Sequence, residues 1–394
     1  MRYEELLYSG QLDRLMAETL PRVEDDADAR RVFLRMMMAR DNVHLLSPSS
    51  IALLREGAMH GDRYAQYGFA RYLTSVQPEK DSLLQAFGWA TKAMEQGVAD
   101  AKALVAAAYS FGDTGVINWD KEWQMKQEAY AEGSELAAMN ILEDLCYGFH
   151  YGEPDEEQAL MMADELIDRD EKAGIDPNGW WYYMRGKAVE HDEPRVRVVA
   201  NYLKAVQLGI LRAYMGVILA YGYDEEYHLC PTAQYRKWLA EGVAHRSSDA
   251  LLMDALDKMN ERTYVETEEE GELIYRRLTE AAKLGNTGAM EQMAWLFQYG
   301  QNGQEEDAQK AYEWYSMGAK HCSTLSTENL WRMLHAGIIE RPEEEQEMLA
   351  LHGARIGSKM LLAEAIRIFR DGGLAEYEEE ILKYLEPAYV GLNG

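Results

Sequence analysis

Hydrophobic positions recur at helical spacing along most of the chain, and they predict a series of short amphipathic helices. One example is the set Ala101, Leu104 and Ala108, whose members lie three or four residues apart and so share one helix face. A polar, glycine-bearing turn, GDTGVINWD at 112–120, follows this helix. A second amphipathic helix completes each unit, as in AQKAYEWYSMG at 308–318. The pattern therefore predicts a repeating unit of two helices joined by a short turn.

Glycine marks the predicted end of the second helix of each unit. LKAVQLG at 203–209 is typical, with small or apolar residues before the glycine and an alanine, Ala213, shortly after it. Glycine just past a helix end favours a left-handed C-cap, because no side chain resists positive φ. The spacings between successive glycines of this kind are 36, 36, 41, 35, 33 and 43 residues. The seven glycines are Gly61, Gly97, Gly133, Gly174, Gly209, Gly242 and Gly285.

A period of this length indicates a helical solenoid. One helix pair cannot bury its apolar face alone, but stacked pairs share a continuous core. The fold is therefore predicted to be all-α, an α-solenoid of stacked antiparallel helix pairs, about nine to ten in number. Each unit is expected to contact only its neighbours along the sequence.

Two units resemble a known family, the Sel-one-like repeats, which are related to the tetratricopeptide repeat. Residues 106–120 (AAAYSFGDTGVINWD) are similar to the turn between the family's two helices. Residues 294–319 are similar to that turn followed by the second helix, with Asp307, Trp314 and Tyr315 at family positions. The resemblance covers most of 51–357, unevenly, because several units lack the turn glycines. It implies a right-handed superhelix with a concave groove, of the kind that adaptors and regulators use.

Shorter segments flank the repeats and are predicted to cap the stack. Residues 1–50 contain two expected helices, near 2–19 and 26–44, before the LLSPSS break. Residues 358–394 contain an expected helix at 359–370 and a charged one at 376–389. The predicted organisation is an N-terminal helical cap at 1–50, a repeat array at 51–357 and C-terminal capping helices at 358–394.

The charge of the chain restricts its partners. The 40 basic and 68 acidic residues give 40 − 68 = −28, with a pI near 4.7. Such a field repels nucleic acid and anionic membranes and favours a basic protein partner. Three widely spaced cysteines indicate a reducing compartment. No stretch is apolar enough to predict a membrane span. A cytoplasmic protein without membrane or nucleic-acid contact is expected, although acidity also serves plain solubility.

No constellation for catalysis, cofactor binding or metal binding stands out. The only close His/Cys neighbours are His321 with Cys322 and His228 with Cys230, and a zinc site needs about four ligands. These pairs lie about two units apart, too far for units that touch only their neighbours. Carboxylate runs such as 266–272 fall in predicted turns or first helical turns, where acids favour the helix dipole. No enzyme activity, cofactor or metal is predicted.

Aromatic residues offer the candidate partner contacts. Tyrosines before the turns between helices are assigned to packing, namely Tyr72, Tyr109, Tyr147, Tyr221 and Tyr299. Four consecutive aromatics at 180–183 cannot all face inward on one helix, and the loop at 221–231 is long and irregular for its unit. Tyrosine and tryptophan are enriched at interface centres, although partial burial against neighbouring helices is an equal alternative. The candidate partner-binding residues are Trp180, Trp181, Tyr182, Tyr223, Asp224, Glu225 and Glu226.

Three hypotheses about function follow. The leading one is a non-catalytic scaffold or regulator that binds a protein partner, in a sharper form an immunity-type inhibitor or an adaptor for a basic protein. The second is a ligand-binding or enzymatic pocket inside the superhelix, lined by the aromatic block and the acids of 224–226. The third is a regulator that assembles with copies of itself.

Overall fold

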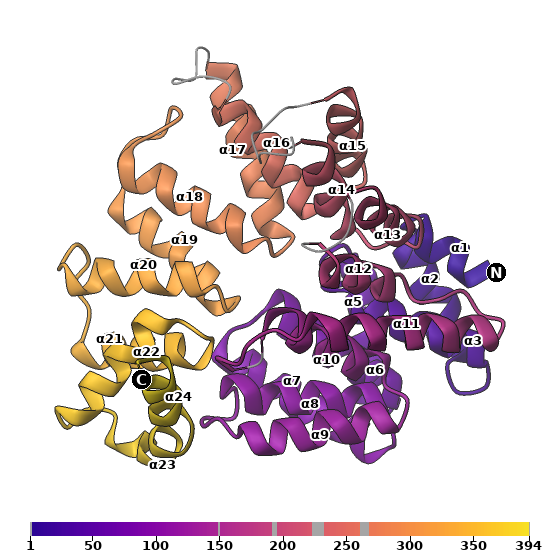
Figure 1. Ribbon diagram of the computed structural model, residues 1–394, viewed down its shortest axis with the longest axis horizontal. Coiled ribbons are helices and arrows are strands. Elements are labelled where there is room, and N and C mark those ends of the chain that lie inside the picture. The colour runs from indigo at the N-terminus through magenta and orange to yellow at the C-terminus, as the bar shows by residue number, and fades with distance from the viewer. Residues whose placement is uncertain (1, 149, 191–194, 223–231, 261–267, 394) are drawn as a thin grey trace.

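A computed structural model describes residues 2–148, 150–190, 195–222, 232–260 and 268–393, and all regular secondary structure in these ranges is helical. The predicted all-α solenoid is confirmed: successive helices pack as neighbours along the chain (Figure 1). Candidate residues Tyr223, Asp224, Glu225 and Glu226 lie outside the described residues, as do His228 and Cys230.

Eight consecutive helix pairs form the body of the stack, and flanking helices extend it towards the nine to ten pairs predicted. In each pair the first helix begins just after the preceding junction and the second leads to the next one. The pairs are α6 (Arg63–Val76) with α7 (Lys80–Glu95), α8 (Ala99–Phe111) with α9 (Trp119–Ala131), α10 (Glu135–Tyr147) with α11 (Glu156–Lys172), α12 (Gly179–Ala188) with α13 (Arg195–Gln207), α14 (Ala213–Gly222) with α15 (Ala233–Ala244), α16 (Ser248–Asn260) with α17 (Glu268–Lys283), α18 (Thr287–Tyr299) with α19 (Ala308–Lys320), and α20 (Thr324–His335) with α21 (Glu343–Arg355).

The flanking segments contain shorter helices. The first expected helix is divided by a turn at Ser9–Gly10, and the second by the extended residue Ala39. At the other end, the expected helix at 359–370 is found as α22. The N-terminal helices are α1 (Arg2–Tyr8), α2 (Leu12–Thr19), the 3-10 turn η1 (Leu20–Arg22), α3 (Ala27–Met38), α4 (Arg40–His44) and α5 (Pro48–Met59). The C-terminal ones are α22 (Lys359–Arg370), η2 (Ala375–Tyr377), α23 (Glu378–Glu380), the π-helical turn η3 (Ile381–Leu385) and α24 (Glu386–Asn393).

A residue with left-handed backbone conformation joins each helix pair to the next. Six of the seven glycines predicted for these junctions occupy such a position, and Gly242 does not. Gly242 lies inside α15 and has no positive φ, whereas Arg246 takes the left-handed position with φ of 58°. Gly242 serves close helix packing instead, because a Cβ there would lie 2.7 Å from the Cβ of Ala250. The corrected junction spacings are 36, 36, 41, 35, 37, 39, 37 and 35 residues. The left-handed residues are Gly61, Gly97, Gly133, Gly174, Gly209, Arg246, Gly285, Cys322 and Gly357.

Hydrogen bonds between adjacent units recur at these junctions. At several junctions the residue after the left-handed one caps the next helix, as Ser134 does for α10 by accepting from the Ala137 amide at 3.0 Å. The same hydroxyl donates to the buried carboxylate of Asp100 in the preceding unit. Asn286 repeats the arrangement by donating to Asp249 at 2.8 Å. The caps Ser134 and Asn286 therefore tie their helices to the previous unit as well as starting the next helix.

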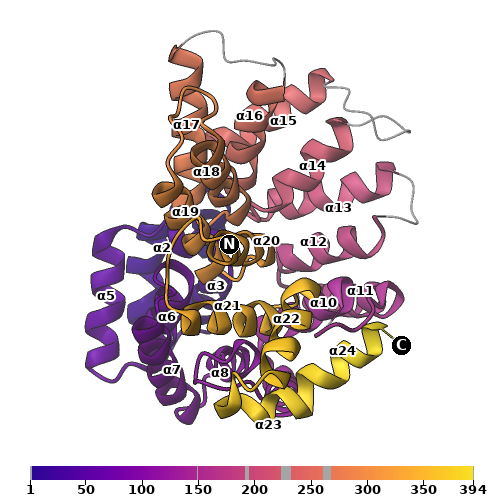
Figure 2. The same ribbon diagram turned by 90° about the vertical axis from the view of Figure 1, so that its left-hand side faces the viewer.

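The superhelix also contacts itself from one turn to the next, so the expectation of contacts between neighbouring units alone is wrong for this chain. Lys320 pairs with Glu79 at 2.9 Å, and Arg355 donates to the Gly115 carbonyl at 2.9 Å. These pairs are separated by 320 − 79 = 241 and 355 − 115 = 240 residues. Figures 1 and 2 show the yellow C-terminal helices returning beside the purple α7–α9 helices. One turn of the superhelix therefore takes about 240 residues.

Helix α4 lies in the interior between the two turns. Arg71 of α6 donates to the carbonyls of Met37 and Met38 at 3.1 and 2.8 Å, which holds the chain entering α4 against the first turn. The imidazole of His44 packs on Gly285 of the second turn, 285 − 44 = 241 residues away, where any Cβ would lie 2.5 Å from its Nε2. The segment before α4 is accordingly among the most buried of the described chain. The division of the chain at residues 50 and 357 stays a prediction.

Candidate protein-interaction site

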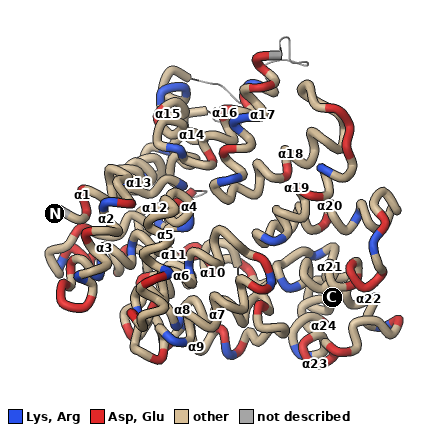
Figure 3. The backbone as a smooth tube through the Cα atoms, turned by 180° about the vertical axis from the view of Figure 1, so that it is seen from behind, with Lys and Arg blue, Asp and Glu red and all other residues tan. Residues whose placement is uncertain are grey.

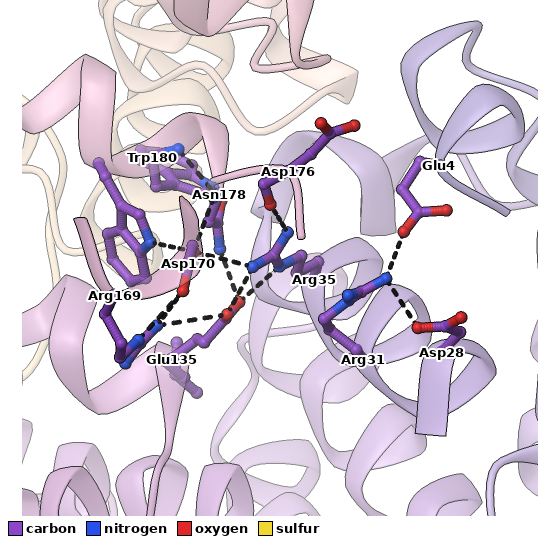
Figure 4. A network of polar contacts seen from close by, with 12 residues as sticks. Glu4, Asp28, Arg31, Arg35, Glu135, Arg169, Asp170, Asp176, Asn178 and Trp180 are labelled. Atoms are coloured by element: carbon purple, nitrogen blue, oxygen red, sulfur yellow. Dashed lines mark hydrogen bonds and ion pairs between the residues drawn. The ribbon is translucent and has the colours of Figure 1, made fainter. Parts of the chain in front are cut away.

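A buried polar network holds α11 and α12 against the N-terminal helices (Figure 4). Its centre is the carboxylate of Asp170 on the inner face of α11, which is 1% exposed. Asp170 Oδ2 accepts from the indole Nε1 of Trp181 at 3.0 Å, from Arg35 at 3.1 Å and from the Asn178 amide at 3.2 Å. A buried carboxylate with this many donors is electrostatically satisfied, so the network fixes the position of α11.

Arg35 of α3 joins the N-terminal segment to this network. Its guanidinium makes two 2.8 Å hydrogen bonds to the carboxylate of Glu135 and a 2.7 Å bond to the Asp176 carbonyl. Burial by itself lowers the pKa of Arg35, but the ion pairs with Glu135 and Asp170 outweigh that effect and raise it. The two-pronged geometry uses the planar fork that distinguishes arginine from lysine.

The structure places the predicted aromatic block mostly inside the protein. Trp181 is fully buried, and Trp180 and Tyr183 are 5% and 6% exposed. The Trp180 and Tyr183 rings pack edge to face with centroids 5.4 Å apart. Tyr182 is half-buried, and Lys204 Nζ lies 6.0 Å from its ring centroid. Among the described candidates, Tyr182 alone presents a partly open side chain, and the two tryptophans are core residues.

The outer face of α11 carries a row of exposed acids around one exposed methionine. Met161 is 55% exposed and lies on the side of the helix opposite Ala159, Ala163 and Asp170. Asp164 pairs with Arg185 at 2.7 Å, and Lys172 lies 3.6 Å from Asp168. Figure 2 places α11 at the edge of the molecule. We call this surface the α11 ridge; its residues are Glu157, Met161, Asp164, Glu165, Asp168 and Glu171.

The sequence pattern gave no sign of the α11 ridge, because its acids alternate with the apolar positions of an ordinary amphipathic helix. Acidic residues also occur in many other places along the backbone (Figure 3). Met161 could have been noticed as an apolar residue out of phase with the buried stripe of Ala159, Ala163 and Leu166. Exposure of a large apolar side chain within a polar rim is typical of interface centres.

Two tyrosines that the sequence assigned to packing are exposed instead. Tyr147 and Tyr299 are 51% and 55% exposed, so the packing assignment is wrong for them. Tyr72, Tyr109 and Tyr221 are half-buried, in keeping with that assignment. Lys121 covers Tyr109, with its Nζ 4.1 Å from the ring centroid and 2.7 Å from the phenol oxygen.

One serine and histidine pair has hydrogen-bonding geometry but poor access. Ser110 Oγ lies 3.2 Å from His150 Nε2, and the Trp119 ring stacks on the imidazole at 4.0 Å. Burial lowers the pKa of His150 to about 3, so the ring stays neutral at physiological pH. Ser110 is itself buried, with 7% of its surface exposed. This pair is therefore a packing contact between α8 and the α10–α11 connection.

A metal ion or a small molecule would need clustered ligands or an enclosed cavity among the described residues. No group of three or more His, Cys, Asp or Glu side chains there is placed to share a metal ion. The cavity at the start of α12, lined by Tyr8, Arg35, Asn178 and Gly209, measures about 10 Å³. That volume holds roughly one water molecule. None of the described helices has the length and apolar character that crossing a membrane requires.

Comparison with known proteins gives likenesses of overall shape. No protein-family model matches the sequence, and no curated protein matches it. A Sel1 repeat protein from Oxalobacter formigenes is 16% identical with a TM-score of 0.40, covering 84% of this chain and 94% of that one. A protective antigen of uropathogenic Escherichia coli strains, c5321, which displays an SLR fold, is 16% identical with a TM-score of 0.39, covering 87% and 81%. Both structures carry the name of the repeat family that the sequence resembles.

Proposed function

We propose that this protein is a non-catalytic scaffold that binds a basic protein partner through the α11 ridge. The observation that carries the proposal is the exposed Met161 among the acids Glu165 and Asp168, on a helix whose inner face is fixed by the Asp170 network. An apolar anchor with a charged rim is the usual composition of a protein interface. Because the helix is already ordered, binding costs little conformational entropy.

Charge complementarity supports a basic partner in particular. The chain carries −28 overall, and the α11 ridge adds local acids that would attract a cationic surface during approach. Such attraction raises association rates and penalises acidic competitors. In its finer form, the proposal is that the protein acts in the cytoplasm either as an immunity-type inhibitor of a basic protein or as an adaptor for one. That finer form rests on the charge.

The alternatives have less support. A ligand pocket at the aromatic block would need far more than the 10 Å³ found at the start of α12. Self-assembly would need a surface that complements itself, and a protein of this charge repels its own copies. Sedimentation of the purified chain without partner separates this last alternative from the scaffold.

The test is a charge-reversal comparison in affinity capture from the native cells. The ridge variant combines Glu157→Lys, Glu165→Lys and Asp168→Lys. Its control combines Glu56→Lys, Asp81→Lys and Glu95→Lys, which changes the net charge equally on exposed positions of α5 and α7. We expect one stoichiometric basic protein to be retained at low salt by the wild type and the control, and lost from the ridge variant. Equal retention by all three would refute the α11 ridge as the site.

Met161 offers a second, charge-free test. Met161→Ser removes the apolar anchor and leaves every acid in place. With the captured partner in hand, we expect this variant to bind at least about tenfold more weakly, as for the loss of a central contact. Met59→Ser on α5, which removes a methionine that is 69% exposed against 55% for Met161, should bind like the wild type.

A further inference from the structure

Two histidines from different parts of the superhelix face each other in its interior. His44 is the last residue of α4, and His321 directly follows α19. Their ring centroids lie 6.2 Å apart, although 321 − 44 = 277 residues separate them along the chain. His44 also lies against Gly285, at the junction between α17 and α18. The pair therefore belongs to the contact between the two turns.

Each imidazole of this pair has one buried nitrogen, Nδ1, that meets no hydrogen-bond partner among the described residues. A neutral imidazole has a single N–H donor, whereas the protonated ring has two. Protonation would therefore leave a buried charge with an unsatisfied donor, which is far more costly than protonation of the same ring in water. Both rings are suited to the neutral form while the two turns remain in contact.

Positive side chains around the pair strengthen this preference. Burial lowers the pKa of His44 to about 4, and Arg40 acts in the same direction, against backbone hydrogen bonds that act the other way. Burial likewise lowers the pKa of His321 to about 4. Arg40, His44 and Lys320 add to that second effect. Each histidine thus disfavours protonation of the other, because two like charges at this distance repel.

The acids near the pair respond to pH in the opposite sense. Asp41 on α4 and Asp113 after α8, which lies beside Cys322, each have a pKa raised to about 6, mainly by burial. Acidification protonates these carboxyls more readily in the closed form than in an open one, so through them it stabilises the closed form. Glu79 is held by Lys320 at 2.9 Å. The other titratable residues around the pair are Lys283, Cys322 and His352.

We propose that His44 and His321 form a pH-dependent switch that loosens the contact between the two turns of the superhelix on acidification. Histidine is the side chain whose charge ordinarily changes between pH 5 and 8. Once the turns separate, both rings reach water and bind protons with the ordinary pKa of 6.5. Proton uptake therefore favours the separated form increasingly as the pH falls from about 6.5 towards 4, and has no such effect well above pH 6.5. The switch is independent of the α11 ridge, and either can exist without the other.

The experiment is amide hydrogen exchange of the full chain at pH 7.5 and pH 5.0, corrected for the intrinsic dependence of exchange on pH. At pH 5.0, a pKa that rises from about 4 to 6.5 on opening favours the open form by about thirtyfold for each histidine. Asp41 and Asp113 oppose this by up to about tenfold each. We therefore expect protection in the wild type to fall by about tenfold. The fall should appear in α4 and around Gly285, while α11 keeps its protection.

Two variants and a control test the assignment to these histidines. His44→Gln and His321→Gln each keep a polar side chain that does not titrate, so in either variant the protection of α4 should no longer fall at pH 5.0. His60→Gln, which changes an exposed histidine at the end of α5, should respond like the wild type. Circular dichroism at pH 7.5 reports whether each variant is folded, and one folded variant is enough for the comparison.

The place where the wild type loses protection is an independent check that needs no variant. Loss confined to α4 and the Gly285 junction supports the switch, whereas an equal loss in α11 means that the whole chain unfolds in acid. That result would overturn the proposal. Protection in the wild type that does not fall at all, or a wild-type response in a folded His44→Gln or His321→Gln variant, would overturn it as well.

Discussion

Arg355 and Glu380 form a buried ion pair, with both nitrogen–oxygen distances at 2.9 Å, where the C-terminal helices meet the first turn of the superhelix. Their side chains are 7% and 3% exposed. Glu380 Oε2 also accepts from the Ile117 amide at 3.0 Å, so one carboxylate joins the two turns. Tyr151 adds a hydrogen bond to the Ala354 carbonyl.

Removing Glu380 should therefore loosen the contact between the turns. Glu380→Ala leaves Arg355 buried without its counter-charge, which typically costs about 3–5 kcal/mol. We expect a loss of this size in chemical denaturation, together with faster amide exchange at Ile117. Glu386→Ala, which breaks the exposed pair of Glu386 with Arg370, should cost less than about 1 kcal/mol. Unchanged exchange at Ile117 in Glu380→Ala would show that the turns do not depend on this pair.

Arg35 should matter as much to the other end of the chain. Arg35→Ala leaves Glu135 and the buried Asp170 with the half-exposed Arg169 as their remaining cationic partner, so we expect a loss of about 3 kcal/mol, the low end for a broken buried ion pair. Arg14→Ala breaks an exposed pair with Glu18 within one helix and should change stability by less than about 0.5 kcal/mol. Urea unfolding of both variants gives the comparison. Similar stability of the two would contradict the structural role assigned to Arg35.

Asp100 should make the stability depend on pH. Burial raises its pKa from the ordinary 3.8 to about 6, against the hydrogen bonds from Ser134 and the Leu136 amide. Between these values the unfolded chain has released the proton and the folded chain keeps it, so stability falls as pH rises from about 4 to about 6. The full effect is on the order of 3 kcal/mol.

Asp100→Asn cannot ionise and should lack this component. We expect its stability relative to the wild type to improve by about that amount between pH 4 and pH 7.5, measured by urea unfolding at both values. Ser134→Ala provides a companion test. Because the Ser134 hydroxyl lowers the Asp100 pKa, its loss should move the midpoint of the pH effect upward. A relative stability of Asp100→Asn that is constant with pH would contradict the assignment.

Two glycines in helices should respond oppositely to alanine. Gly88 in α7 has open space around it, so Gly88→Ala should stabilise the protein by about 0.5–1 kcal/mol through helix propensity. Gly242 in α15 touches Ala250, so Gly242→Ala should destabilise it by about 1–3 kcal/mol through overpacking. Thermal unfolding of the two variants measures both effects. A stabilising Gly242→Ala would mean that the two helices can separate without cost.

The sequence was informative where the determining physics is local. Gly97 and Gly133 end their helices because a left-handed residue is needed there, and that need is visible in the residue itself. At Arg246 and Cys322 the left-handed backbone position is occupied by a residue other than glycine. Near Arg246 the sequence pattern therefore pointed to Gly242, whose small size is needed for close packing against Ala250. The repeat survives such exchanges because small size and positive φ are separate requirements.

The candidate site was less predictable, since it depends on contacts between distant segments. Trp181 is buried because Asp170 accepts its indole proton and Arg35, well over a hundred residues earlier, neutralises that carboxylate. Nothing in the run of four aromatics reveals which ring finds such a partner. His44 was likewise unremarkable in the sequence, since its contact with Gly285 follows from how two turns of the superhelix close around α4.

The contact between the turns has a consequence for how this chain can evolve. An open array tolerates the gain or loss of a unit, because each unit meets only its immediate neighbours. Here the offsets of 241 and 240 residues between Glu79 and Lys320 and between Gly115 and Arg355 are fixed by the path around one full turn. Duplicating or deleting one unit within that path would displace every cross-turn partner together. We therefore expect the number of repeats between α7 and α19 to stay constant, and changes in chain length to occur only in the connecting loops.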